Sequence, residues 1–194
     1  MRLRTLSRLA SSILLLLLMV GAFAQENPMP MGILTSKTML ANRMDVRAAI
    51  GLSPEQSAKV QESIGQMEGV NVSQSGAGST FSAFDSANKS LFTNEQWSKL
   101  TQLWMQFEGA FTLQDYEIAE GLKLSEEVRD KVTQMAGEYR QWWGGQVARI
   151  KKPSDLKRIK DTARKVSEKM LGLLDKDQKK RFLEMQGPKF KFTS

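Results

Sequence analysis

A short signature that starts helices occurs four times in this chain, and it constrains the fold more than any other feature. Each copy has an apolar residue, then a helix-capping residue and, in three copies, a glutamine three positions after the cap. The copies are Leu52, Ser53 and Gln56; Phe92, Thr93 and Gln96; Leu124 and Ser125, followed by Val128; and Leu174, Asp175 and Gln178. The cap accepts a hydrogen bond from a first-turn amide, and the glutamine reaches back to the cap amide. The signature therefore predicts four helix starts, of which the third lacks its glutamine.

The four copies are also ordered in pairs along the chain. The first and third copies lie 72 residues apart, and the second and fourth lie 82 apart. Matching segments that recur in the same order at similar offsets indicate a tandem repeat. We predict two helical modules at residues 36–109 and 110–190, a tail at 191–194, and a Gly/Ser linker at 69–79 inside the first module.

Apolar residues recur at steps of three and four along three further stretches, at residues 97–111, 128–142 and 153–174. This is the period of an amphipathic helix, and no stretch alternates as a strand does. Gly144 and Gly145 are expected to kink the second of these helices. Such stripes need a partner helix, either in the same chain or in a second copy. The expected fold is all-α, made of helical hairpins or a bundle. The stripes do not decide between a monomer and a homodimer.

The N-terminus has the features of a cleavable export signal. Three arginines precede an apolar run at residues 13–20, which is about half of the ~20 residues that a spanning helix needs. A small-x-small site predicts cleavage between Ala24 and Gln25. We therefore expect residues 1–24 to be a signal peptide and residues 25–35 a flexible mature N-terminus. The mature chain would be periplasmic or secreted, with no membrane span after cleavage.

Charge is distributed unevenly along the chain. Residues 25–150 carry 11 Lys and Arg against 15 Asp and Glu, whereas residues 151–194 carry 14 against 6. A basic segment favours anionic partners, and nucleic acid is not expected outside the cytoplasm. The candidate basic surface consists of Lys157, Arg158, Lys160, Arg164, Lys165, Lys179, Lys180 and Arg181.

The composition excludes several classes of chemistry. The chain has no histidine and no cysteine, which removes Ser-His-Asp triads, thiol redox chemistry and nearly all catalytic zinc sites. A hydrolase using two carboxylates stays possible in principle. However, acids such as Asp115, Glu117 and Glu120 fall around helix ends, where a solvated surface is the expected environment. We therefore expect no enzyme activity, no metal and no cofactor.

The first two signatures resemble the LTxxQ motif of the Spy and CpxP group of periplasmic proteins. The matching segments are Leu52 to Gln56 and Phe92 to Gln96. The resemblance implies an exported, helical, cofactor-free protein that binds unfolded clients without ATP or takes part in the envelope-stress response. In the best-known members, an antiparallel dimer of bent hairpins forms a cradle. This chain departs from them by carrying four copies, and so looks more like duplicated exported bacterial members of the group.

These features lead to two functional hypotheses. The first is a non-enzymatic, chaperone-like envelope protein that binds other proteins through apolar surface, to which Trp97, Trp104, Trp142 and Trp143 contribute if they do not form the core. Because Trp142 and Trp143 are adjacent, at least one is expected to be exposed or at an interface. The alternative is an adaptor held on an anionic envelope surface by the basic C-terminal helix.

Overall fold

The computed structural model describes residues 35–67, 77–147 and 149–193. Within these ranges helices dominate and no strand occurs, which confirms the predicted all-α fold. The α-helices are α2 (Lys37–Leu40), α3 (Met44–Ile50), α4 (Pro54–Met67), α5 (Ala77–Asn88), α6 (Asn94–Glu108), α7 (Tyr116–Gly121), α8 (Glu126–Val147), α9 (Pro153–Gly172) and α10 (Lys176–Met185). Two 3₁₀ turns, η1 (Lys89–Leu91) and η2 (Gly109–Gln114), connect α5 to α6 and α6 to α7.

The long helices α8 and α9 follow the two C-terminal apolar stripes. Helix α9 begins at Pro153, because proline has the right φ for a first helical turn and needs no amide partner there. Gly144 and Gly145 do not end α8, since the helix continues through them to Val147. Packing along α9 stabilises this stretch against the low helix propensity of glycine.

The stripe predicted for residues 97–111 does not form one helix. Helix α6 ends at Gly109, which has a φ of 60° and a ψ of −138°, a backbone conformation available mainly to glycine. Phe111 therefore reaches the core from η2 and not from α6. The turn η2 contacts α6, α7, α8 and α9, so it lies where the helices of the two predicted modules meet.

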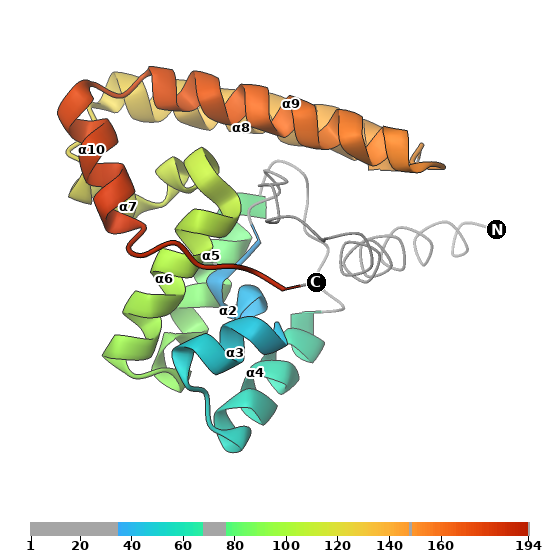
Figure 1. The fold of residues 1–194 in the computed structure, drawn as a ribbon, viewed down its shortest axis with the longest axis vertical. Coiled ribbons are helices and arrows are strands. Elements are labelled where there is room, and N and C mark those ends of the chain that lie inside the picture. Colours follow the sequence, from blue (N-terminus) through green and yellow to red (C-terminus); the bar gives the residue numbers. More distant parts are fainter. Residues whose placement is uncertain (1–34, 68–76, 148, 194) are drawn as a thin grey trace.

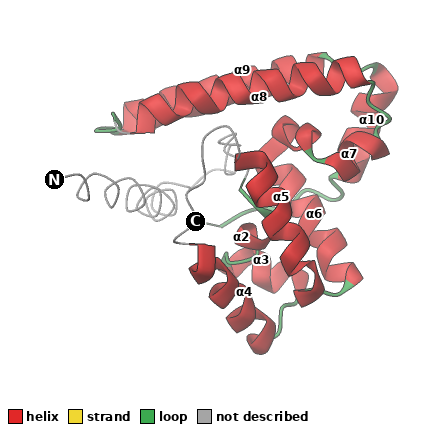
Figure 2. Cartoon of the chain, turned by 180° about the vertical axis from the view of Figure 1, so that it is seen from behind, coloured by secondary structure: helices red, strands yellow, loops and turns green. Residues whose placement is uncertain are grey.

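Helices α8 and α9 form a long antiparallel hairpin along one edge of the molecule (Figure 1). Helices α2 to α6 form a body beside it, and α7 and α10 lie where the hairpin joins that body. The far end of the hairpin extends beyond the body, as the view from behind also shows (Figure 2). Buried side chains of α6 and α9, among them Leu100, Ile159 and Met170, show that the apolar stripes dock within one chain.

Residues 186–193 form an extended C-terminal strap that returns from α10 across α6 to α3 (Figure 1). Gln106 of α6 donates to the Gln186 carbonyl at 2.7 Å and accepts from the Phe190 amide at 2.8 Å. Phe192 is 8% exposed, and its ring lies 5.4 Å from that of Phe107. The segment predicted as a tail is therefore anchored on the first module, because its aromatic side chain gains by burial.

Asp45 of α3 holds the end of this strap. It accepts from the Thr193 amide at 2.7 Å and pairs with Arg43 at 3.0 Å. Burial acts to raise the pKa of Asp45, but the Arg43 and Thr193 hydrogen bonds and the Arg43 charge outweigh it and lower that pKa. Asp45 therefore stays ionised at neutral pH and keeps the strap in place.

Some predicted boundaries differ from those in the structure, and other predicted segments lie outside the described residues. Helix α5 starts at Ala77, so the last residues of the predicted 69–79 linker are helical, because α5 packs against α2. Thr35, the last residue of the predicted flexible N-terminus, donates its amide to Glu108 at 2.7 Å. The predicted signal peptide with its Ala24–Gln25 cleavage site, residues 25–34, and residues 69–76 of the linker lie outside the described residues.

Candidate functional site

The glutamines of the first two signatures bond to each other. Gln56 donates its Nε2 to Oε1 of Gln96 at 2.8 Å, and Gln96 donates its Nε2 to Oε1 of Gln56 at 3.1 Å. Gln56 Nε2 also donates to the carbonyl of Leu91 at 2.8 Å, and Gln96 Nε2 to that of Gly51 at 3.0 Å. Each glutamine thus reaches the backbone just before the other signature, so the pair joins the starts of α4 and α6.

The same glutamines complete the caps of their own helices. Gln56 Oε1 accepts from the Ser53 amide at 3.0 Å, and Ser53 Oγ accepts from the Gln56 amide at 3.1 Å. Thr93 and Gln96 form the equivalent reciprocal pair at the start of α6. One side-chain amide therefore serves both its own helix and the neighbouring one, a role that the capping pattern alone does not reveal.

The last two signatures form only half of this arrangement. Asp175 and Gln178 make a capping box, and Gln178 Nε2 donates to the Leu122 carbonyl at 3.3 Å. Ser125 accepts from the amide of Val128 at 3.4 Å, but the valine side chain has no group to return the bond. The starts of α8 and α10 are therefore joined by the side chain of Gln178, with no return bond from the third signature.

We expect replacement of Gln96 by alanine to lower the free energy of unfolding by about 2 kcal/mol. The variant loses the bond to the Thr93 amide and leaves polar groups at Gly51 and Gln56 without their partner. Urea unfolding measures the effect, with Gln178→Ala as the matched control, because Gln178 makes fewer interhelical contacts. Equal effects in the two variants, or no coupling in a Gln56/Gln96 double-mutant cycle, would contradict the reciprocal bond.

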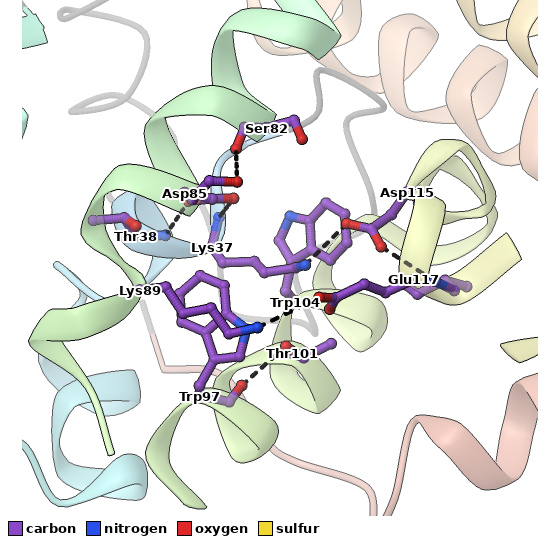
Figure 3. A network of polar contacts seen from close by, with 12 residues as sticks. Lys37, Thr38, Ser82, Asp85, Lys89, Trp97, Thr101, Trp104, Asp115 and Glu117 are labelled. Carbon is purple, nitrogen blue, oxygen red and sulfur yellow. Dashed lines mark hydrogen bonds and ion pairs between the residues drawn. The ribbon is translucent and has the colours of Figure 1, made fainter. Parts of the chain in front are cut away.

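A buried lysine lies at the centre of a second polar cluster, between α2, α5, α6 and α7 (Figure 3). The Lys37 side chain is 5% exposed, and its Nζ lies 2.9 Å from Oδ2 of Asp115. The same Nζ lies 4.9 Å from the ring centroid of Trp104 and 5.5 Å from that of Trp97. The ammonium group is thus held by one carboxylate and two aromatic rings, which attract a cation through their π faces.

Asp85 of α5 holds the backbone of α2 at this lysine. Its carboxylate accepts from the amides of Lys37 and Thr38, both at 2.9 Å. These are first-turn amides of α2, which have no partner inside the helix. At the edge of the cluster Lys89 pairs with Glu117 at 3.4 Å, where both side chains are exposed to water. The contacts bind α2 to the rest of the body, and the covered Lys37 amine is not placed to react with a substrate.

The expectation that Asp115 lies on a solvated surface is wrong. Its side chain is 18% exposed, because it pairs with Lys37 and also accepts from the Ile118 amide at 3.2 Å as the N-cap of α7. Lys37 and Asp115 lie 78 residues apart in the sequence. Capping marks Asp115 only as a helix start, and no local pattern connects it with Lys37, which is why sequence reasoning missed the pair.

The four tryptophans lie in the core or pack against it. Trp97 and Trp104 are buried at 8% and 4% exposure, and they belong to the core with Phe107 and Phe111. Trp142 and Trp143 are both half-buried against that core, so neither ring is fully exposed, and a place for either ring at an interface stays a prediction. Helix α8, which carries both rings, contacts α9 and η2, and the ring centroid of Trp142 lies 5.6 Å from that of Tyr139.

The predicted basic residues lie on α9 and α10, and all are exposed except the half-buried Lys160. Three of them have a polar neighbour: Arg158 bonds to Gln146, Arg164 pairs with Glu168, and Lys180 lies 3.8 Å from Glu184. Within the described ranges the other five make no ion pair. Exposed pairs of this kind contribute little, so the face keeps its positive charge.

No protein-family model, curated protein or solved structure matches this chain. The resemblance to the Spy and CpxP group therefore stays a prediction based on the signatures. No helix in the described ranges is both long and apolar enough to span a membrane. Across the same residues, no three acidic side chains gather as ligands of a metal ion.

Proposed function

We propose that this protein is a non-enzymatic, exported attachment protein that binds an anionic envelope surface through the basic face of α9 and α10. The observation that carries the proposal is the exposure of the predicted cations on the side of the hairpin and on α10. Electrostatic attraction to a polyanion needs accessible positive charge and no specific pocket. Lys157, Lys165, Lys179 and Arg181 supply such charge without an anionic partner in the described part of the chain.

Apolar client binding, as in a chaperone, has less support. Within the described ranges, the large apolar residues that are exposed are Met44, Tyr116 and Leu183, on three different helices. Single exposed apolar side chains are common on proteins and do not form a binding patch. Of the tryptophans that such a surface would need, Trp97 and Trp104 lie in the core, and Trp142 and Trp143 are half-buried against it. The attachment hypothesis therefore accounts for more of the surface.

We expect the chain from Gln25 onward to bind vesicles of phosphatidylglycerol and phosphatidylcholine, and to bind phosphatidylcholine vesicles weakly. Binding should fall steeply as sodium chloride rises from about 50 mM to about 500 mM, because salt screens exposed charges. Co-sedimentation measures both effects, and a soluble polyphosphate serves as a lipid-free anionic probe. Absence of binding to every anionic probe would overturn the proposal. Binding that survives high salt would favour the chaperone-like alternative.

A further inference from the structure

The outer half of the α8–α9 hairpin differs in charge from the half that lies near α10. Between residues 139 and 165 the chain carries nine Lys and Arg against two Asp and Glu. Between residues 125 and 138, at the near end of α8, it carries two against four. The basic half is also the half that extends beyond the body (Figures 1 and 2). Positive charge is therefore concentrated where a flat partner could approach without meeting the described helices of the body.

The loop at the end of the hairpin is shaped by one of these two acids. Asp155 accepts from the backbone amides of Lys151 and Lys152 at 3.0 and 3.2 Å. These bonds fold the loop against the first turn of α9, while the side chains of both lysines stay exposed. Arg149, Lys157 and Arg158 are exposed beside them. We name these five residues, together with Ile150, the hairpin tip.

Ile150 is the residue that favours a lipid surface over other polyanionic partners. It lies between Arg149 and Lys151 in the loop and is only half-buried. An apolar side chain gains free energy by entering the headgroup region of a bilayer, and flanking cations bind anionic headgroups at the same time. A hydrated anionic polymer offers the cations the same attraction but offers Ile150 no apolar environment. The combination therefore favours a membrane surface.

We infer that the hairpin tip docks end-on onto an anionic lipid bilayer, with Ile150 entering the headgroup region. This inference rests on the proposed attachment function, names a lipid bilayer as the anionic surface, and narrows the contact from the whole basic face of α9 and α10 to the hairpin tip. Helix α10 lies at the opposite end of the hairpin (Figure 1). Its basic residues would then lie away from the membrane; they are Lys179, Lys180 and Arg181. The two basic clusters provide a matched comparison, because each can lose three positive charges.

The test compares the triple variants Arg149→Gln/Lys151→Gln/Lys152→Gln and Lys179→Gln/Lys180→Gln/Arg181→Gln. On phosphatidylglycerol-containing vesicles at low salt, we expect the tip variant to bind about 100-fold more weakly, since each basic residue near such a surface contributes a factor of about five. The α10 variant should lose less than about threefold. All six residues are exposed, and thermal unfolding checks that both variants keep the fold. Equal losses would overturn end-on docking and leave the proposed function standing.

A single substitution tests whether the anionic surface is a lipid bilayer. We expect Ile150→Ser to weaken binding to anionic vesicles about fivefold or more, and to leave binding to soluble polyphosphate unchanged. Unchanged vesicle binding by this variant would overturn the insertion of Ile150. If the unmodified chain binds polyphosphate but no vesicle, the bilayer inference fails while attachment to anionic surfaces survives. If it binds neither probe, the proposed function fails as well.

Discussion

Replacement of Phe111 by alanine is expected to lower the free energy of unfolding by about 3–5 kcal/mol, the largest effect we predict for a single core residue. The Phe111 side chain is fully buried, and its ring lies 5.2 Å from that of Tyr139 in α8. It projects from η2, which contacts both α6 and the α8–α9 hairpin. The cavity would therefore open where the two predicted modules meet. Urea unfolding followed by circular dichroism measures the loss.

Leu183 provides the control for this prediction. It is 65% exposed on α10, so Leu183→Ala should change the free energy of unfolding by less than about 0.5 kcal/mol. Two separate unfolding transitions in the Phe111→Ala variant would show that the modules still fold but no longer support each other. A loss below about 1 kcal/mol would contradict the central position of Phe111.

Asp115→Asn is expected to destabilise the protein by about 2–3 kcal/mol. Asparagine keeps the shape of the side chain and an oxygen that can cap α7, so the change removes mainly the negative charge beside Lys37. A buried ammonium group without its counter-ion is costly, and the 18% exposure of Asp115 makes the cost smaller than for a fully buried pair. Chemical unfolding at neutral pH measures the difference.

The matched change at the other end of this ion pair is Lys37→Met. Methionine keeps most of the apolar stem between Trp97 and Trp104, so the single variant should lose less stability than Asp115→Asn. The double variant should recover part of the Asp115→Asn loss, because no buried charge is then left alone. Additive effects of the two substitutions would show that the pair contributes nothing beyond its separate members.

The positions of the motif glutamines show how far the signatures could be interpreted from the sequence. Capping depends on residues three apart, so the pattern at Thr93 and Gln96 indicates a helix start wherever the segment lies. The bond between Gln56 and Gln96 joins residues 40 apart, and nothing in either signature indicates it. The valine at position 128 marked the third copy as incomplete, and its consequence for joining the helices became visible only in the fold.

The helical class, the helix starts and the basic segment could be predicted without the fold, because caps, 3.6-residue stripes and net charge are properties of neighbouring residues. The tertiary structure was needed to show that Trp97 and Trp104 lie in the core and that Lys37 pairs with Asp115. It also decided that Thr193 returns to Asp45, 148 residues away in the chain. Such contacts depend on which apolar faces meet, and many pairings of amphipathic helices satisfy the same local pattern until the whole chain is packed.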